Sequence, residues 1–495
     1  MTVADRIRCK DPTLWGDVDS PELANRLGWV DLPETMEPRL GELEEIRTRV
    51  LAEDTEDVIV LGMGGSSLAP EVFADTFGVA PGHPRLRVLD STHPDQVRHL
   101  AESIDPNRSI FLVASKSGTT LETLSGFRFF WKATGENGDR FIAITDPDTP
   151  LEELAHERDF LAAVLAPPEV GGRFSALTPF GLLPAALIGA DPGRLLEAAA
   201  AVDWKEAVEI GERWAQSARE GRDKLSFLTS PAIRTFPVWL EQLVAESLGK
   251  DGKGIVPVAS EPALDRYGED RLFVQYRLAG QPVAAVPADQ PAFRREISDR
   301  YGLATEMMAA EIATAAAAIG LGVHPFDQPD VELAKERARQ ALGSDLARVD
   351  LVEIFSPTLA DQIEALLMTM APTDYFALQA FLPTESETDS ILSAIRHRVG
   401  NRSGNATTAG FGPRFLHSTG QLHKGGPNTG VFMQLLDTPT ADVEIPGGSE
   451  TFGRVIAAQA LGDYLALRER GRRVMRIDLG PNRRKGLQTL LDSIG

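Results

Sequence analysis

Short apolar runs alternate with amphipathic stretches between residues 57 and 190, and this alternation constrains the fold more than any other feature of the chain. The runs cover residues 57–61, 86–90, 109–114 and 140–145. Each is followed by a stretch in which apolar residues recur with helical spacing. Strands that alternate with helices pair as βαβ units, so the pattern predicts a parallel sheet with helices on both faces.

The length of 495 residues requires more than one domain. Residues 1–56 have a mostly helical pattern. We expect a first doubly wound domain at 57–205, a second at 206–345 and an additional region at 346–495 that mixes helices and strands. The predicted fold class is therefore α/β, with two doubly wound parallel sheets, a helical N-terminal segment and an α/β C-terminal region.

Elements are also predicted within the later regions. In the second domain we expect a strand, a long helix and two further strands, in that order, at residues 224–229, 232–248, 271–278 and 282–286. In the C-terminal region we expect three helices, at 357–370, 386–398 and 449–470, and three strands, at 374–381, 430–436 and 472–478. Two stretches there are rich in Gly, Asn, Ser and Thr, which predicts loops at 401–409 and 420–430.

The charge and composition exclude several kinds of partner. A net charge of −22 argues against nucleic acid, because nucleic-acid phosphates require clustered cations. The one cysteine, Cys9, excludes an intrachain disulfide and favours a reducing, cytoplasmic setting. Residues 1–10 lack the apolar core of a secretory signal. The longest apolar stretch, 312–323, is too short for a membrane span, so we expect no membrane partner and interpret it as a buried helix.

Hydroxyl groups are concentrated where the third predicted strand gives way to a helix. The segment 115–123 reads SKSGTTLET. Free backbone N–H groups and the positive end of a helix dipole meet at such a point, so four hydroxyls, a glycine and Lys116 predict a site for a small phosphate. The alternative is an ordinary helix N-cap, because Ser and Thr commonly cap helices.

A second glycine-rich turn, GMGGSS at residues 62–67, follows the first predicted strand. Its glycines allow a ligand close to the backbone, and its serines can cap the helix or donate to an anion. A dinucleotide site is an alternative, with Asp90 as the ribose-binding acid, although Ser67 stands where that motif has its third glycine. Two anion-binding turns on neighbouring strand ends favour one sugar phosphate over a dinucleotide.

Two charged residues occupy positions from which they could act on a substrate. Arg173, in the turn GGRFS, could stabilise an oxyanion, although arginines in turns are usually solvated. Glu246 lies in the last turn of a helix that we expect Gly249, in the left-handed conformation, to end. The helix dipole disfavours a carboxylate there, which suits a general base. The alternative is a surface glutamate whose charge is offset by nearby lysines such as Lys250.

Further candidates lie later in the chain. The segment that begins at His324 is expected to start a helix, with Lys335 one to two turns in, and a lysine so placed is commonly solvated. His417 and His423 lie among glycines, but their spacing and the lack of a nearby carboxylate in sequence fit no usual zinc pattern, so no metal site is expected. One of these two histidines could still act as an acid or base.

Five segments together resemble the glucose-6-phosphate isomerase family, which is built on paired sugar-isomerase (SIS) domains. In family order they are LGMGGSSLAP (61–70), SKSGTTLET (115–123), GGRFS (171–175), EQLVAESLGK (241–250) and DQPDVELAK (327–335). Residues 411–432 are similar to the isomerase half of fused transaldolase/glucose-6-phosphate isomerase proteins. The resemblance implies two SIS-type domains and an aldose–ketose isomerase that needs no metal or redox cofactor.

The resemblance also implies roles for particular residues. Glu246 would move a proton between C2 and C1 as glucose 6-phosphate and fructose 6-phosphate interconvert, and Arg173 would stabilise the cis-enediol intermediate. Lys335 and Gln328 would contact the sugar oxygens or the ring. The other implied substrate-binding residues would hold the 6-phosphate or surround it, and they are Gly65, Ser66, Ser115, Lys116, Ser117, Thr120 and Gly172.

The chain departs from the family in the position of one histidine. In the family a histidine between the glutamate and the lysine opens the pyranose ring and reaches across a subunit interface, so a homodimer is expected. Here no histidine lies between Glu246 and His324, and the similar segment LHSTGQ follows Lys335. We assign ring opening to its histidine, His417. A non-catalytic SIS-type sugar-phosphate regulator and a nicotinamide-dependent dehydrogenase are the alternative functions.

Overall fold

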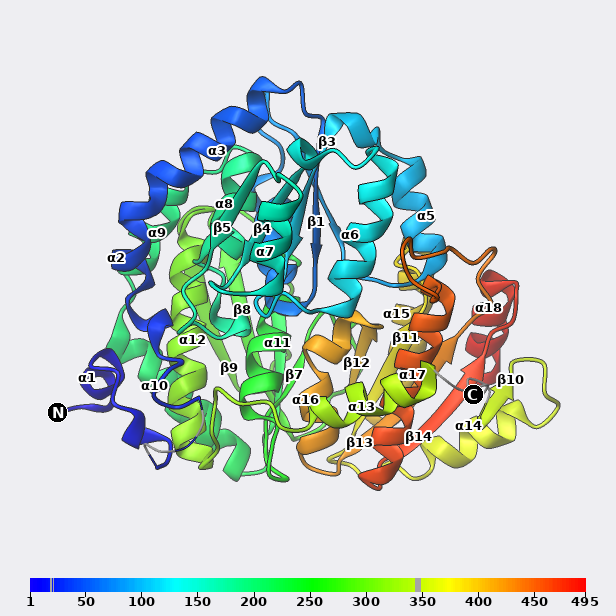
Figure 1. The fold of residues 1–495 in the computed structure, drawn as a ribbon. Coiled ribbons are helices and arrows are strands. Elements are labelled where there is room, and N and C mark those ends of the chain that lie inside the picture. Colours follow the sequence, from blue (N-terminus) through cyan, green and yellow to red (C-terminus); the bar gives the residue numbers. More distant parts are fainter. Residues whose placement is uncertain (18–19, 21, 343–348) are drawn as a thin grey trace.

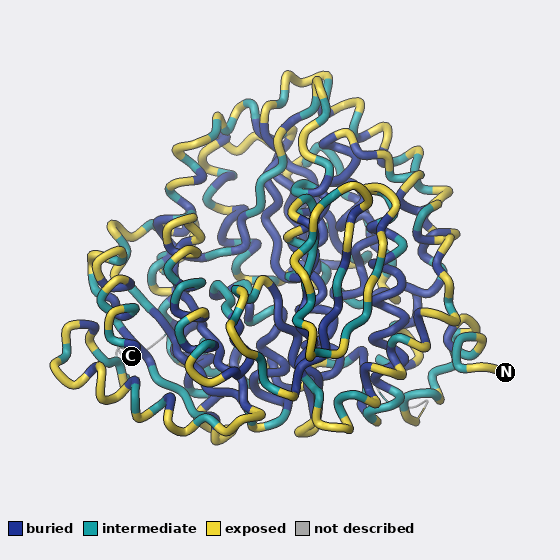
Figure 2. Tube along the Cα trace, turned by 180° about the vertical axis from the view of Figure 1, so that it is seen from behind, coloured by how far each residue is buried: buried dark blue, intermediate teal, exposed yellow. Residues whose placement is uncertain are grey.

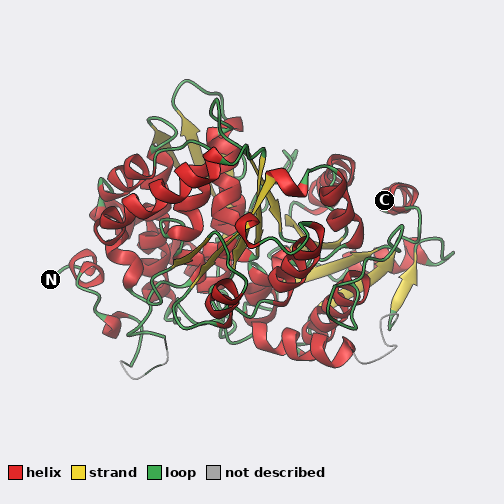
Figure 3. Ribbon diagram, turned by 45° about the horizontal axis from the view of Figure 1, so that its top comes forward, coloured by secondary structure: helices red, strands yellow, loops and turns green. Residues whose placement is uncertain are grey.

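Three parallel sheets organise the computed structural model, which describes residues 1–17, 20, 22–342 and 349–495 (Figure 1). The third sheet lies on the side of the molecule opposite the N-terminus. Helices surround the strands on the outside (Figure 3). The predicted α/β fold class is confirmed. The domain boundary predicted between residues 345 and 346 lies outside the described residues.

The first sheet contains the four strands predicted from the sequence and a fifth, β5, that the sequence analysis does not predict. With four residues, β5 is too short for a clear pattern. The strand order is β2-β1-β3-β4-β5, and all pairs are parallel. The strands are β1 Asp57–Gly62, β2 Arg85–Leu89, β3 Ser109–Ala114, β4 Phe141–Thr145 and β5 Ala162–Leu165.

The order of this sheet fixes where a ligand can bind. Strand order reverses between β1 and β3, and α/β sheets bind ligands beyond the carboxyl ends of the strands at such a reversal. The two turns predicted to bind phosphate follow β1 and β3. The helices that accompany the sheet are α4 Leu68–Phe77, α5 Pro94–Glu102, α6 Leu121–Ala133, α7 Pro150–Glu157 and α8 Pro179–Leu187, with short 3₁₀ turns η4 Gly64–Ser66, η5 Pro106–Arg108, η6 Gly138–Arg140 and η7 Gly172–Phe174.

The N-terminal segment is helical, as predicted, and packs on the first two domains. Its helices are α1 Val3–Arg8, α2 Leu32–Met36 and α3 Leu40–Ala52, with the 3₁₀ turns η1 Pro12–Leu14, η2 Gly28–Asp31 and η3 Glu37–Arg39. Two helices, α9 Pro192–Ala200 and α10 Trp204–Arg219, lead to the second sheet. Thr2 caps α1 through a hydrogen bond to the Asp5 N–H at 3.1 Å, and the Asp5 carboxylate accepts from the Thr2 N–H in return.

The second sheet has the order β7-β6-β8-β9. The strand expected at 282–286 is wrong: those residues form a loop. Pro282 and Pro287 bracket them, and proline lacks the N–H that a sheet needs. The elements are β6 Lys224–Thr229, η8 Pro231–Ile233, α11 Phe236–Leu248, β7 Val256–Val258, β8 Arg271–Leu278, β9 Ala292–Ile297 and α12 Gly302–Leu321.

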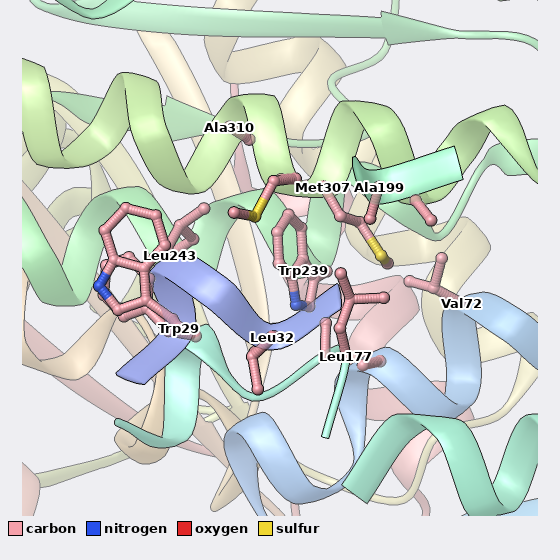
Figure 4. Packing of buried hydrophobic residues seen from close by; sticks show 14 of the residues in the cluster. Trp29, Leu32, Val72, Leu177, Ala199, Trp239, Leu243, Met307 and Ala310 are labelled. Carbon is pink, nitrogen blue, oxygen red and sulfur yellow. The ribbon is translucent and has the colours of Figure 1, made fainter. Parts of the chain in front are cut away.

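Helix α12 lies in the centre of the core. It is long and apolar enough to cross a membrane, but 83% of its most apolar window is buried inside the protein. Its neighbour α10 approaches closely at Gly211, where a Cβ would lie 2.0 Å from the Ala313 carbonyl oxygen. Met307 and Ala310 of α12 pack with Trp239 and Leu243 of α11 (Figure 4). The apolar stretch is thus the buried helix that the sequence predicts.

The third sheet has the order β10-β14-β13-β11-β12. The loop expected at 401–409 holds only for residues 404–405. Residues 401–403 end helix α15, and residues 406–409 belong to β12, which pairs with β11, Ala406 opposite Tyr375. The loop expected at 420–430 contains the short helix α16. After α13 Val331–Leu342, the elements are β10 Leu351–Glu353, α14 Leu359–Leu367, β11 Tyr375–Phe381, α15 Ser386–Ser403, β12 Ala406–Phe411, η10 Arg414–His417, α16 Gly420–Gly425, β13 Gly430–Leu436, α17 Phe452–Glu469, β14 Arg473–Asp478 and α18 Arg483–Ser493.

Buried residues run continuously through the strands and the central helices, while exposed residues follow the outer helices and loops (Figure 2). Apolar contacts also join the third sheet to α11. Ala245 of α11 belongs to a cluster with Tyr375, Phe432 and Leu422. The C-terminal region therefore packs directly on the helix that carries Glu246.

Gly249 does not end α11 in the left-handed conformation that the sequence predicts, since its φ is −86°. The position requires glycine for a different reason. A Cβ there would lie 2.5 Å from Cα of Leu422, in the backbone of α16. The close approach of two backbones replaces the expected turn conformation.

Replacing Gly249 with alanine should therefore push α16 away from α11. We expect Gly249→Ala to lower the free energy of unfolding by about 1–3 kcal/mol, as overpacking does elsewhere, seen as a lower thermal midpoint. Gly41→Ala, in open space on α3, is the matched control and should not lower the midpoint. An unchanged midpoint in Gly249→Ala would show that the two backbones can separate at no cost.

A buried carboxyl group on α11 should make stability depend on pH. Burial raises the pKa of Glu241 to about 7, against the opposing effects of the Ala259 N–H and the Arg396 charge. The unfolded chain releases this proton near pH 4.5, so the stability that it contributes is complete below that pH and is lost as the pH rises through about 7.

We therefore expect the thermal midpoint of Glu241→Gln, relative to the unsubstituted protein, to be higher at pH 8 than at pH 5. The glutamine keeps an acceptor for the Ala259 N–H but does not titrate. Glu157→Gln, at the exposed end of α7, is the control and should change the midpoint equally at both values. A constant difference for Glu241→Gln would contradict the prediction.

Candidate active site

A cavity of about 720 Å³ lies beyond the carboxyl ends of β1 and β3, at the point where the strand order of the first sheet reverses. Segments from the first sheet, α11, α13, η10 and α17 contribute to its wall. Eleven of the twelve residues proposed from the sequence line it: Gly65, Ser66, Lys116, Ser117, Thr120, Gly172, Arg173, Glu246, Gln328, Lys335 and His417.

Ser115 is the one proposed residue that does not line the cavity. It is 2% exposed, and its hydroxyl lies 2.9 Å from that of Thr120. Ser115 therefore contacts Thr120 and does not line the cavity itself.

The hydroxyl-rich loop leaves the start of α6 available to an anion. Thr120 is the N-cap residue, yet its side chain makes no capping hydrogen bond to the helix. The turn passes through Gly118 at a φ of +67°, where a Cβ would lie 2.9 Å from the backbone nitrogen of Leu151. Thr120 is therefore not an ordinary N-cap, because its side chain accepts no hydrogen bond from the N–H groups in the first turn of α6.

Lys116 enters this loop with its ammonium already engaged. It forms an ion pair with Asp146 and donates to the Pro168 carbonyl oxygen at 3.0 Å. Burial lowers the pKa of Lys116, against the opposing effect of the hydrogen bond that its ammonium donates to Asp146. The Lys116 ammonium is therefore held by protein groups.

The turn after β1 packs against the turn that carries Arg173. A Cβ on Gly65 would lie 1.9 Å from the Gly172 carbonyl oxygen, so η4 and η7 touch through their backbones. Gly64 has a φ of +54°, and a Cβ there would lie 2.7 Å from the His417 carbonyl oxygen. Two of the glycines in GMGGSS are therefore required by close approach and backbone conformation within the protein.

Asp90 is occupied by the protein itself. It is ion-paired with Arg414, which also binds Glu71 at 2.5 Å. The Asp90 carboxylate thus joins the first sheet to the C-terminal region and is not available to bind a ribose. The dehydrogenase alternative loses the acid on which it rested.

Arg173 is buried, at 4% exposed, and is not a solvated turn residue. Its guanidinium pairs with Glu246 at 2.9 Å and donates to the Ser247 hydroxyl at 2.9 Å. It also donates to the carbonyl oxygens of Pro325 and Asp327, at 2.6 and 3.0 Å. Arginine here joins the first sheet, α11 and the turn before α13.

Glu246 is 6% exposed and lines the cavity, so the surface-glutamate alternative is wrong. Its second carboxylate oxygen accepts from Gln242 at 3.1 Å, one helical turn earlier. Lys250, offered as a solvated neighbour, is also buried, at 1% exposed, and donates to the His324 and Asp327 carbonyl oxygens. Burial and the charge of Arg173 lower the pKa of Lys250 to about 8.

Gln328, just before α13, and Lys335, within α13, also line the cavity. Lys335 is partly exposed and pairs with Glu332 at 2.7 Å. A lysine at the rim of a cavity can reach a bound ligand by exchanging this exposed partner, because exposed ion pairs contribute little.

His417, in η10 of the C-terminal region, lines the cavity. Its Nε2 lies 2.9 Å from Oε1 of Glu122, and its carbonyl oxygen accepts from Gln242 at 2.9 Å. Burial acts to raise the pKa of Glu122, but the charge and hydrogen bond of His417 hold it below its usual value. Ionised Glu122 can only accept, so Nε2 of His417 carries a proton.

His423 has no comparable place. It is buried among the rings of Tyr375, Phe415 and Phe432, and burial, together with the charge of Lys424, holds its pKa well below the usual value. It is not among the residues that line the cavity. Of the two histidines proposed as an acid or base, only His417 faces the site.

One group of possible metal ligands occurs in the described part of the chain, away from this cavity. The ligand atoms of His93, Asp95 and Asp437 lie within 4.8 Å of one another. Arg483 donates to both carboxylates at 2.9 Å, and His93 donates to Asp437 at 2.9 Å. A cation from the protein therefore already neutralises these oxygens.

Three polar residues that line the cavity, Glu122, Gln242 and Gln459, and the buried Lys250 behind it were not predicted from the sequence. Glu122 stood within SKSGTTLET, and Gln242 lies four residues before Glu246, a helical spacing that could have pointed to it. Lys250 was interpreted as a surface charge. Gln459, which donates to Glu122 at 2.6 Å, lies in an alanine-rich helix and has no signal in the sequence.

The three parallel sheets and the cavity define an α/β protein with a buried arginine–glutamate pair beside a hydroxyl-rich loop, and comparison with known proteins identifies the family. A family model described as phosphoglucose isomerase matches residues 47–270. The glucose-6-phosphate isomerase of Rubrobacter xylanophilus is 30% identical over 385 residues, which are 64% of this chain and 89% of that protein. That of Thermus thermophilus is 35% identical over 301 residues, 57% of this chain and 71% of that protein.

The chain belongs to the glucose-6-phosphate isomerase family of aldose–ketose isomerases. A crystal structure of a glucose-6-phosphate isomerase from Chlamydia trachomatis shares the fold, with a TM-score of 0.54 and 18% identity over 74% of this chain and 81% of that one. Gln328, Lys335 and His417 lie beyond the stretch that the family model matches.

Proposed function

We propose that this protein interconverts glucose 6-phosphate and fructose 6-phosphate, with Glu246 as the base that moves a proton between C2 and C1. The observation that carries the proposal is the convergence of Glu246, Arg173 and the hydroxyl-rich loop on one cavity. A regulator that only binds a sugar phosphate needs the loop alone. A buried carboxylate paired with arginine in the same cavity favours catalysis, as the family does.

The 6-phosphate would bind between the two turns. Ser66, Ser117 and Thr120 supply hydroxyl donors, and the backbones of Gly65 and Lys116 supply N–H groups. The positive end of the α6 dipole adds to the attraction for a dianion. Fixing the phosphate there holds the sugar carbons over Glu246 and Arg173, which lowers the entropy that the reaction must lose.

Proton transfer would use the Arg173–Glu246 pair. Glu246 takes the proton from C2 of the open-chain aldose and returns it to C1, while the oxygen that becomes negative in the enediolate lies beside the fixed guanidinium charge. Gln242 adds a polar contact. Its side-chain amide oxygen is buried and has no hydrogen-bond partner among the described residues, and in the proposal it accepts from a sugar hydroxyl.

Ring opening would fall to His417. Because Nε2 donates to Glu122, the other ring nitrogen, Nδ1, is the one that can exchange a proton with the sugar. Lys335 and Gln328, which line the same cavity, would meet the sugar hydroxyls. Every side chain in this proposal belongs to a single chain, whereas a homodimer and a cytoplasmic setting stay predictions.

Replacing the base should abolish proton exchange at carbon. For Glu246→Gln we expect the exchange of the C1 and C2 hydrogens with D₂O, followed by NMR, to disappear while inorganic phosphate still binds. Glu241→Gln, on the same helix but outside the cavity, is the control and should exchange normally. Exchange that persists in Glu246→Gln would mean that another group is the base.

Removing the guanidinium should slow the chemical step. Losing one electrostatic partner of an oxyanion costs enzymes about 10²–10³ in turnover, so we expect kcat of Arg173→Ala to fall by about that factor in a coupled isomerase assay. Arg173→Lys keeps a charge beside Glu246 and should lose less, which separates lost chemistry from a misfolded site. Equal turnover in Arg173→Ala and the unsubstituted protein would remove Arg173 from the mechanism.

A further inference from the structure

Four polar side chains from four different segments form one hydrogen-bonded series that ends at His417. The Thr92 hydroxyl, after β2, donates to the carbonyl oxygen of Gln459 on α17 at 2.7 Å. The Gln459 amide donates to Oε1 of Glu122 at 2.6 Å. Glu122, in the first turn of α6, accepts from His417 at 2.9 Å. The members are 30 or more residues apart in sequence, so only the folded chain brings them together.

The direction of each hydrogen bond in this series is fixed. Thr92 is fully buried, and Gln459 is 6% exposed. Ionised Glu122 can only accept, so the NH₂ group of Gln459 must face Glu122. The side-chain amide oxygen of Gln459 then faces Thr92, whose hydroxyl is the donor. Glu122 therefore receives two donors, Gln459 and His417, on the same oxygen, and each stabilises its ionised form.

We propose that Gln459, held by Thr92, is a positioning residue that aims Glu122 at His417 and so fixes which nitrogen of the imidazole carries the proton during ring opening. The inference rests on the proposed function, because it assigns ring opening to His417. Gln459 is not needed for the proton transfer between C2 and C1, which belongs to Glu246. The two roles can therefore be separated by substrate.

The charges that face Glu122 support this arrangement. His417 of η10 and Lys335 of α13 both act to keep it ionised. On α17 itself, Asp463 lies one turn beyond Gln459, and its charge is balanced by Lys424 at 2.7 Å. A neutral amide at position 459 thus adds a donor without adding charge. A carboxylate at that position would face Glu122 directly.

The test uses the whole 495-residue chain and two ketose substrates. Fructose 6-phosphate is mostly a closed furanose ring and needs opening. In 5-deoxyfructose 6-phosphate the hydroxyl that closes the furanose is absent and O6 is esterified, so the sugar is an open chain. Exchange of the C1 hydrogens with D₂O reports proton transfer for both sugars in the same cavity, and the open-chain sugar is an internal control for folding, phosphate binding and Glu246.

The decisive variant is Gln459→Glu, which keeps an acceptor for Thr92 but places a second carboxylate beside Glu122. Two carboxylates in one site do not both ionise readily, so Glu122 should become protonated at higher pH. We expect turnover of fructose 6-phosphate at pH 7 to fall by about tenfold or more, with the acidic limb of its pH profile moved to higher pH by about one unit. Turnover of the open-chain sugar should change by less than about twofold.

Two substitutions at the other end of the series provide a matched pair. Thr92→Val keeps the shape but removes the hydroxyl, and we expect a smaller loss in the same direction, confined to fructose 6-phosphate. Thr92→Ser keeps the hydroxyl and should restore turnover. Adding Thr92→Val to Gln459→Glu should cause little further loss, because residues that act in series are not additive.

The outcomes separate the two proposals. Selective loss on the ring-closed sugar with a shifted acidic limb supports the positioning role. Equal loss on both sugars, or an unshifted pH profile, overturns it and makes Gln459 a structural or direct binding residue. If the unsubstituted protein exchanges the hydrogens of neither sugar, the proposed function itself is wrong.

Discussion

The buried charge of Arg173 is the constraint on which the site depends. A guanidinium that is 4% exposed must have its hydrogen bonds satisfied by protein groups, because an unpaired charge in the interior is strongly unfavourable. Its partners come from α11 and from the turn at residues 325–327, while Arg173 itself follows the first sheet. One side chain therefore fixes three segments around the same cavity. The same pairing puts a cation against Glu246, the group proposed to accept a proton from carbon.

Ion pairs and hydrogen bonds also hold the C-terminal region, which carries His417, against the first two sheets. Arg414 links η10 to Asp90 and Glu71 of the first domain. Arg271 of β8 binds Glu261 at 2.8 Å, and the same glutamate accepts from the Thr407 N–H of β12 at 2.8 Å. Arg414 lies three residues before His417, and the contacts of Glu261 join the second sheet to the third. Ion pairs at such joints set geometry more than they add stability, which suits a residue that must meet its substrate within a few tenths of an ångström.

Sequence patterns predicted the fold where strands are long and apolar and failed where they are short or polar. The strands at 57–61, 109–114 and 430–436 were clear because each is an apolar run. The strand at 406–411 was missed because ATTAGF looks like a loop, and it forms because β11 offers a parallel partner. Gly249 was expected to stop a helix by its own conformation, but its neighbour Leu422 decides the residue type there.

The sequence by itself determined the local chemistry of this protein. Turns, caps and helix ends are set by near neighbours in the chain. The sequence alone therefore pointed to the hydroxyl-rich loop SKSGTTLET, the glycine turn GMGGSS and the helix-end carboxylate of Glu246. Only the tertiary structure decided which charges are buried and which distant residues meet. Glu122 and His417 are 295 positions apart, and Glu122 and Gln459 are 337 apart. Contacts of that separation depend on how whole sheets pack, and packing is a property of all three sheets together, with no signature in any one segment.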